Sequence, residues 1–242
     1  MKRELFAIGD YVHVFNRGNR KMAIFYDDND RWRFLKILRY FNDVYSPENI
    51  FRKISEFHKF DTKQFSSEDY TWSWPSGWPE HNKLVKIISF CLMPNHFHLL
   101  LKETTEGGIS KFMAKLGTGF TGYVNLKYKS TGRLFQGPYK NKTIEDMRYL
   151  QYLNIYIQLL NPFELYPGGF ELARKEFDKA FEFTMNYRFG SLPDSFNKRN
   201  LGIIDKDVFG EMFPTLEKYK EVARDAILTK NIKESLGKSA ID

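Results

Sequence analysis

The feature that most constrains the fold is a long apolar segment that a single turn signal interrupts. Val85–Met93 is an apolar, β-branched run, which is the pattern of a buried strand. Pro94-Asn95 breaks this run, and residues 96–101 continue it as a second apolar strand. The segment therefore predicts two paired strands inside the protein.

The rest of the chain up to residue 160 alternates short strands with helices. Residues 11–15 are β-rich and stop at the turn signal Asn16-Arg17-Gly18-Asn19. Apolar side chains at helical spacing predict three helices, over residues 28–45 with Asp28 or Asn29 as the cap, over 109–129 and over 144–160. Residues 133–143 are expected to be extended. Because this order cannot consist of βαβ crossovers alone, we expect an α+β sandwich with helices packed on an antiparallel sheet.

The domain organisation follows from changes along the chain. We expect one domain over residues 1–165 and a small helical appendage over residues 166–242. Residues 57–83 resemble an insertion loop, since residues 71–79 carry three Trp and two Pro with no regular period. We expect these aromatic side chains to pack within the loop, because stacking on bases needs neighbouring positive charge that the loop lacks.

Charge and cysteine content narrow the class of protein. The formal net charge of +7 favours a polyanionic partner. Cys91 is the single cysteine, which excludes an intramolecular disulfide and a thiolate metal cluster. No run approaches the roughly 20 apolar residues of a membrane span, and the first residues lack the apolar stretch of a signal peptide. We therefore expect a cytoplasmic protein without a membrane partner.

His96 and His98 are the most informative polar residues. Residues i and i+2 of a strand face the same side, so the two imidazoles should lie side by side while Phe97 enters the core opposite. Two neutral imidazoles on a rigid strand form half of a divalent-metal site. The alternative is two half-buried structural histidines, but so apolar a strand makes their desolvation costly unless they bind something. Cys91 is expected on the wrong strand parity to join them.

Four ordered segments within residues 10–165 carry a family resemblance. They are Val12 to Arg20 with Ile24-Phe25 and Asp30 to Leu38; Cys91 to Leu101 with His96-Phe97-His98; Tyr123-Val124-Asn125 with Thr131 to Gly137 and Tyr139-Lys140; and Tyr149-Leu150 with Tyr156-Ile157 and Asn161-Pro162. With these segments the chain resembles the HUH single-tyrosine transposases, in particular the REP-associated tyrosine transposases.

The resemblance implies a ferredoxin-like α+β sandwich and a metal-dependent enzyme that cuts and joins single-stranded DNA. It implies Tyr156 as the nucleophile, with Tyr152 in reserve, forming a 5′-phosphotyrosine intermediate. It also implies that His96, His98 and one further polar ligand hold Mg²⁺ or Mn²⁺. The implied partner is single-stranded DNA with hairpin or palindromic ends, and the chain is either a monomer or a homodimer.

The third metal ligand departs from the family pattern. A ligand-type side chain usually follows the tyrosine by four positions, but Leu160 stands there and Asn161 follows by five. Either a π-bulge brings Asn161 into place, or Gln158 or Asn154 serves, or the ligand is lost. Loss of the ligand favours the alternative function, a catalytically inactive single-stranded DNA- or RNA-binding protein of the same fold.

A basic stretch over residues 111–142 contains seven Lys and Arg and no Asp or Glu. Aromatic residues interleave with these charges, which is the composition of a surface that follows a phosphate backbone and stacks bases. Another basic group follows the first strand. The residues expected to bind DNA are Arg17, Arg20, Lys21, Lys127, Lys129, Arg133, Lys140 and Lys142.

Overall fold

The computed structural model describes residues 6–47, 50, 72 and 74–229. Within these residues, four antiparallel strands form one sheet in the order β2-β3-β1-β4. The strands are β1 (Tyr11–Arg17), β2 (Val85–Met93), β3 (His96–Glu103) and β4 (Lys140–Ile144). Helices α1 (Asp28–Tyr40) and α3 (Gly108–Lys127) complete a βαββαβ order, which is the ferredoxin-like arrangement. The predicted α+β sandwich is confirmed.

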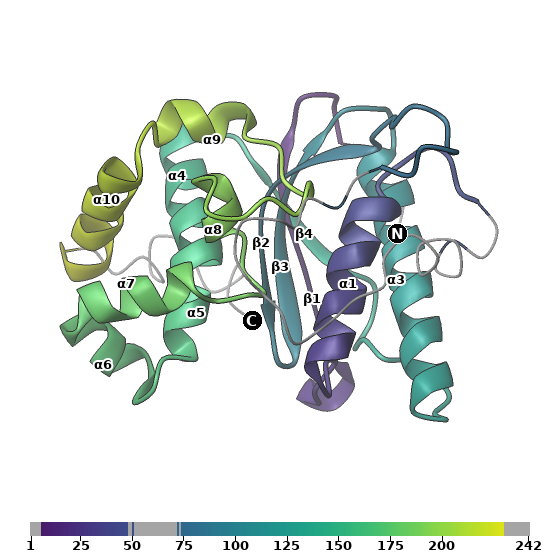
Figure 1. The fold of residues 1–242 in the computed structure, drawn as a ribbon, viewed down its shortest axis with the longest axis horizontal. Helices are drawn as coiled ribbons and strands as arrows, with labels where there is room; N and C mark the ends of the chain where they lie inside the picture. Colours follow the sequence, from purple (N-terminus) through teal and green to yellow (C-terminus); the bar gives the residue numbers. More distant parts are fainter. Residues whose placement is uncertain (1–5, 48–49, 51–71, 73, 230–242) are drawn as a thin grey trace.

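One face of the sheet packs against α1 and α3 (Figure 1). Alternation along β1 and β3 directs Val14, Phe97 and Leu99 to this side. The ring of Phe34 in α1 lies between them and α3, with its centroid 5.0 Å from Phe97 and 4.9 Å from Phe120. These contacts form the first hydrophobic core.

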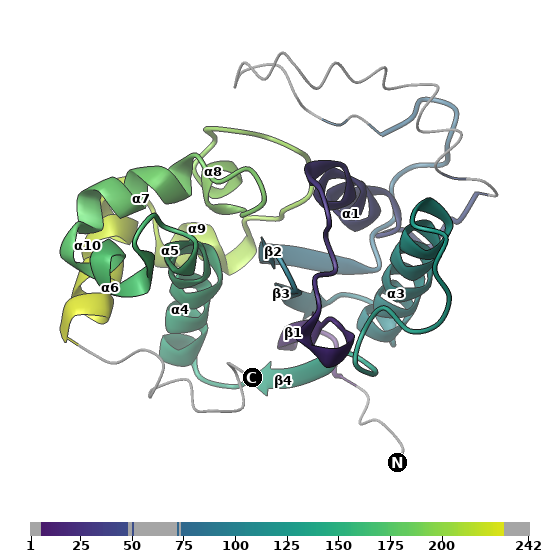
Figure 2. The same cartoon turned by 90° about the horizontal axis from the view of Figure 1, so that it is seen from below.

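The opposite face of the sheet packs against a long helical segment. The segment consists of α4 (Met147–Ile155), the π-helix η2 (Tyr156–Leu160) and α5 (Asn161–Glu164), and Figure 2 shows it across the sheet from α1 and α3. Its buried side chains, among them Ile157, form a second core with Cys91 and Leu100 of the sheet. Strand β3 thus lies between two helical layers, and its alternating side chains enter different cores.

The described part of the C-terminal region is helical and packs against the second core. Its helices are α6 (Gly169–Lys175), α7 (Phe177–Met185), α8 (Leu192–Ser195), α9 (Asp207–Met212) and α10 (Leu216–Thr229). After α7 the chain runs along β2, where Leu92 N–H donates to Phe189 O at 2.9 Å and Ser191 N–H donates to Phe90 O at 3.0 Å. This contact covers an edge of the sheet. The domain boundary after residue 165 stays a prediction.

None of the helices in the described ranges is long and apolar enough to cross a membrane.

One helix cap and one helix start differ from the sequence prediction. Helix α1 begins at Asp28, but its cap is Asp27, which forms a capping box with Asp30, rather than Asp28 or Asn29. The later helix begins at Met147 instead of residue 144, because Ile144 pairs with Tyr11 at the end of β4. In both cases hydrogen bonds outside the apolar periodicity decide the boundary.

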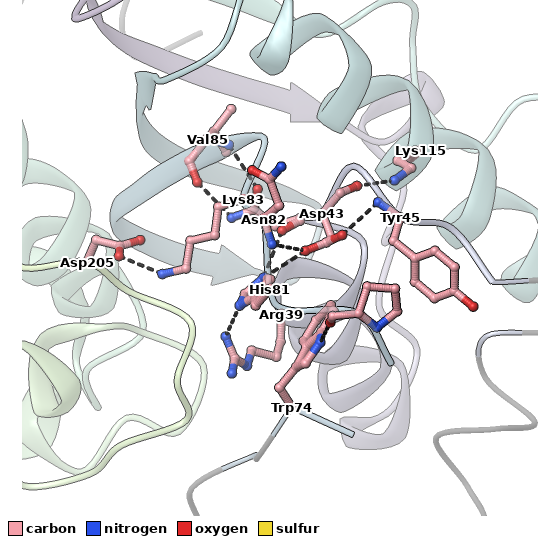
Figure 3. Close-up of polar contacts among 12 residues, drawn as sticks. Arg39, Asp43, Tyr45, Trp74, His81, Asn82, Lys83, Val85, Lys115 and Asp205 are labelled. Carbon is pink, nitrogen blue, oxygen red and sulfur yellow. Dashed lines mark hydrogen bonds and ion pairs between the residues drawn. The ribbon is translucent and has the colours of Figure 1, made fainter. Parts of the chain in front are cut away.

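The end of α1 is tied to the chain that leads into β2 (Figure 3). Buried Asp43 accepts hydrogen bonds from the backbone N–H groups of Tyr45 and Asn82, both at 2.6 Å. The ring of His81 stacks on Trp74 with centroids 4.0 Å apart, and Arg39 donates to its Nδ1 at 3.2 Å. Helix α1 ends at Tyr40 and not at residue 45 as predicted, and Asp43 makes these contacts from the chain that follows the helix.

Most of the predicted insertion loop, residues 57–83, lies outside the described residues. Trp72 is 2% exposed, and the rings of Trp74 and Trp78 both lie about 6.1 Å from the ring of buried Tyr40. These tryptophans therefore pack within the protein, which is the arrangement expected from the composition of the loop.

Candidate active site

The two histidines of β3 lie side by side on the face that α4 and η2 cover. Their ring centroids are 5.1 Å apart and the rings are nearly perpendicular. His98 is 2% exposed and His96 is half-buried, while Phe97 between them is buried in the first core. Strand alternation thus gives the pair the geometry that its spacing predicts.

Tyr156 approaches this pair from the same chain. It is the first residue of η2, and its ring meets His98 edge-on with centroids 5.3 Å apart. Tyr156 is only 3% exposed and belongs to the second core. The reserve candidate, Tyr152, is half-buried one turn earlier in α4. The helix and the histidine strand, far apart in the sequence, therefore meet without a second subunit.

A π-turn links Tyr156 to Asn161. The backbone N–H of Asn161 donates to the carbonyl oxygen of Tyr156, a five-residue spacing in place of the four-residue spacing of an α-helix. The side-chain Nδ2 of Asn161 donates to the same carbonyl at 3.1 Å and to that of Ile157 at 3.5 Å. With the amide nitrogen used in this way, the amide oxygen is the atom that could bind a metal ion.

The other two candidates for the third ligand are held elsewhere. The Nε2 of Gln158 donates to the hydroxyl groups of Ser191 and Ser195, at 3.0 and 2.8 Å. The Oδ1 of Asn154 accepts a hydrogen bond from Ser89 of β2 at 2.9 Å. Both amides therefore join η2 and α4 to neighbouring elements. The amide oxygen of Asn154 is engaged in this way, whereas the Oε1 of Gln158 has no hydrogen-bond partner among the described residues, so Gln158 and Asn161 both keep an amide oxygen that could bind a metal ion.

A third histidine, His13 of β1, belongs to the cluster and was not among the predicted site residues. Its Nε2 lies 2.9 Å from Nδ1 of His98, and its ring lies 6.4 Å from the ring of Tyr156. His13 is fully buried. The contact depends on the β1–β3 register, in which Phe15 pairs with His98. A lone histidine in an apolar strand was the only signal in the sequence.

The three imidazoles are neutral at neutral pH. Burial lowers the pKa of His13 to about 3, with a smaller contribution from Lys142. Burial also lowers the pKa of His96 to about 4, helped by Arg17, and it holds the pKa of His98 well below its ordinary value. Neutral imidazole is the form that binds a metal ion.

The hydrogen bonds of His96 and His98 decide which nitrogen could bind a metal. The Nδ1 of His96 donates to Oδ1 of Asn95 at 2.7 Å, and Nδ1 of His98 is occupied by His13. Each ring is therefore left with Nε2 as a possible ligand atom. Among the described residues, no group of three or more His, Cys, Asp or Glu is arranged to hold a metal ion. A metal site built on His96 and His98 would need a further donor of another kind, such as the amide oxygen of Asn161.

Cys91 does not lie on the face of the sheet opposite the histidines, as its strand parity was expected to place it. Cys91 pairs directly with His98 across β2 and β3, so its side chain is on the same face, since the turn between the strands sets their register. Burial raises the pKa of its thiol far above the ordinary range. Cys91 is unsuited as a ligand because it stays protonated.

Three of the basic residues expected to bind DNA stand on the histidine face. Arg17 pairs with His96 across β1 and β3, and Lys142 and Lys140 of β4 pair with His13 and Phe15. Directly paired residues share a face of the sheet. Positive charge therefore extends from the histidines to the β4 edge. The other expected residues with exposed positions are Arg20, Lys21, Lys127, Lys129 and Arg133.

Lys127 is held by carboxylates from another part of the chain. Its ammonium group lies 2.7 Å from Asp27 and 2.7 Å from buried Asp30, and Asp30 also accepts from the hydroxyl groups of Tyr123 and Tyr128. The basic stretch lacks acidic residues in the sequence, but folding brings these two to it. Lys127 is therefore less suited to bind phosphate than Lys140.

A cavity of about 700 Å³ lies on the other side of the sheet, between α3 and residues 132–139. Its walls include Asn16, Arg133, Phe135 and Tyr139, and no Asp or Glu of the described residues lines it. A Cβ added to Gly117 on its α3 wall would meet nothing within 4 Å. The size is typical of small-ligand sites.

Residues 79–159 match the family model described as "Transposase IS200 like". No curated protein matches the sequence. A solved structure described as "Structure of the REP associates tyrosine transposase bound to a REP hairpin" matches at 11% identity with a TM-score of 0.43, covering 81% of this chain and 83% of that chain. Over the segment that carries His96, His98 and Tyr156, the chain resembles the IS200-like transposases, as its motifs predict.

Proposed function

We propose that this protein is a metal-dependent endonuclease and strand transferase that acts on single-stranded DNA through Tyr156. The observation that carries the proposal is the position of Tyr156, with its ring 5.3 Å from His98 and its helix joined to Asn161 by a π-turn. A nucleophile beside candidate metal ligands is the arrangement that phosphodiester transfer needs.

The proposed reaction exchanges one ester for another. The phenolic oxygen of Tyr156 attacks phosphorus, the bond to the 3′ oxygen breaks, and the products are a 5′-phosphotyrosine link and a 3′-hydroxyl group. The phenol loses its proton and the leaving oxygen gains one. Because a phenol has a pKa near 10, Tyr156 needs activation. A divalent ion held by His96, His98 and Asn161 would lower the barrier from the phosphate side, by polarising the phosphate oxygens so that phosphorus is attacked more readily.

The remaining side chains would position the DNA. Arg17, Lys140 and Lys142 offer positive charge on the histidine face, where it can hold the backbone of the strand. The cavity on the other side of the sheet, next to Arg133, could take an unstacked base, which a single strand can supply without breaking a base pair. We propose hairpin-ended single strands as the substrate class, on the basis of the family resemblance.

The burial of Tyr156 favours a second candidate function. A side chain that is 3% exposed reaches a phosphate only if its neighbours move aside. A protein that binds single-stranded DNA or RNA without cutting it would need no such movement. This alternative keeps the basic residues in the same role and leaves Tyr156 as part of the core.

Trapping the covalent intermediate tests the proposal. The full chain is incubated with Mn²⁺ and hairpin-ended single-stranded DNA from the flanks of its own gene, and the adduct is mapped by mass spectrometry. We expect the DNA on Tyr156 and its loss in Tyr156→Phe, His96→Ala and His98→Ala. Tyr152→Phe is the matched control and should retain the adduct. A gel shift without any adduct would instead support the binding protein.

A further inference from the structure

The contact between His13 and His98 has the geometry of a hydrogen bond between two imidazoles. Nε2 of His13 and Nδ1 of His98 are 2.9 Å apart. The two ring planes are nearly parallel, at an angle of 21°, with centroids 5.1 Å apart. Both side chains are buried, at 0% and 2% exposure. The bond joins neighbouring strands through residues 85 positions apart, so the fold holds both rings in place.

The direction of this bond follows from what a metal ligand requires. A nitrogen that binds a metal carries no proton, so a neutral imidazole bound through Nε2 carries its proton on Nδ1. We propose that His13 is a positioning residue that accepts this Nδ1 hydrogen bond from His98. It would thereby fix the tautomer and the ring orientation that present Nε2 of His98 to a divalent metal ion. The inference rests on the proposed function for the metal site, but not on the cutting reaction.

His96 is held in the same manner, which supports this assignment. Its Nδ1 donates to Oδ1 of Asn95 at 2.7 Å, so both histidines of β3 are fixed from their Nδ1 side. Outer hydrogen bonds of this kind are general for metal-binding histidines and set which nitrogen is available. His13 would accept the Nδ1 hydrogen bond of His98, as Asn95 accepts that of His96.

The unsatisfied nitrogen of His13 is the cost of this arrangement. When its Nε2 accepts, its proton sits on Nδ1, a buried atom without a hydrogen-bond partner among the described residues. An unpaired buried donor is destabilising, and apolar side chains fill such positions more favourably. The neighbours of His13 along the strand are Val12 and Val14. A valine would also fill position 13 if packing were the only role of this side chain. A role toward His98 accounts for a histidine at this position.

The test compares Mn²⁺ affinity in variants that keep or remove the acceptor. In His13→Gln the side-chain oxygen can replace Nε2 as acceptor, whereas His13→Leu removes it but still fills the space. We expect Mn²⁺ to bind about 10- to 100-fold more weakly to His13→Leu, measured by calorimetry, and within about threefold of the unchanged protein in His13→Gln. Val14→Ala, on the opposite face of β1, is the control for damage to the strand. Urea unfolding shows that each variant is folded.

A second measurement identifies the ligating nitrogen directly. Long-range ¹⁵N–¹H spectra of the protein loaded with diamagnetic Zn²⁺ should show His98 bound through Nε2 with its proton on Nδ1. Binding through Nδ1, or ligation by His13 itself, would overturn the proposal, as would equal Mn²⁺ affinity in His13→Leu. If affinity and spectra agree with the proposal but no adduct forms on Tyr156, the positioning role stands and the cutting function fails. If the adduct forms on Tyr156 but His13→Leu binds Mn²⁺ as tightly as the unchanged protein, the cutting function stands and the positioning role fails.

Discussion

The backbone N–H of Asn161 donates to the carbonyl oxygen of Tyr156, five residues earlier, so a π-turn joins the candidate nucleophile to the candidate third ligand. An α-helical turn would have placed buried Leu160 in that position instead. The turn therefore holds one residue more than an α-helical turn, while the role of Asn161 as a metal ligand stays a prediction.

Asn161→Ala should weaken Mn²⁺ binding by about tenfold or more, since it removes one of three ligands. Gln158→Ala is the matched comparison, because its amide binds Ser191 and Ser195. We expect it to lower the free energy of unfolding while Mn²⁺ affinity stays within about threefold. Calorimetry and urea unfolding measure the two effects. If Gln158→Ala lost the metal and Asn161→Ala kept it, the assignment of the third ligand would be wrong.

Lys140→Ala and Lys127→Ala should have different effects. Lys140 lies on the histidine face, so its removal should weaken single-stranded DNA binding and reduce the slope of log affinity against log salt by about 0.7. Lys127 pairs with Asp30, and its removal should lower the free energy of unfolding by about 1.5–3 kcal/mol. Fluorescence anisotropy over a salt series and urea unfolding measure these changes. A larger loss of DNA binding in Lys127→Ala would reverse the assignment.

Acid should weaken the contact between α1 and the chain before β2. Burial, assisted by Arg39, holds the pKa of His81 below its ordinary value of 6.5. Below pH 6.5 the unfolded chain therefore binds more protons at this residue than the folded protein does, and stability falls as the pH falls. In His81→Gln, the free energy of unfolding should decrease less between pH 7 and pH 5. Urea unfolding at both pH values checks this, and an unchanged pH dependence would contradict it.

Gly117 offers a test of the cavity that leaves the metal site untouched. Gly117→Ala should stabilise the protein by about 0.5–1 kcal/mol, because Ala is the better helix former and its Cβ meets nothing within 4 Å. Gly117→Phe should fill the cavity and weaken DNA binding several-fold, with Mn²⁺ affinity unchanged. Anisotropy and calorimetry separate the two effects. Undiminished DNA binding by a folded Gly117→Phe variant would exclude the cavity as a base site.

The sequence by itself determined the features that depend on local periodicity. The apolar run of β2 and β3, broken at Pro94-Asn95, specifies a hairpin, and alternation of two places His96 and His98 on one face. The apolar spacing before Tyr156 specifies its helix, and the five-residue gap to Asn161 raised the π-turn as one of several solutions. Each of these depends on residues a few positions apart.

Tertiary structure alone decided which distant residues meet. The register of β1 against β3 brings His13 to His98, and the packing of α1 beside α3 brings Asp30 to Lys127. The packing of η2 and α4 on their neighbours also decides that Ser89 engages the amide oxygen of Asn154, while Ser191 and Ser195 engage the amide nitrogen of Gln158. A linear pattern carries no register between strands and no pairing between charges on separate helices, because both are chosen by the energy of the whole packed arrangement.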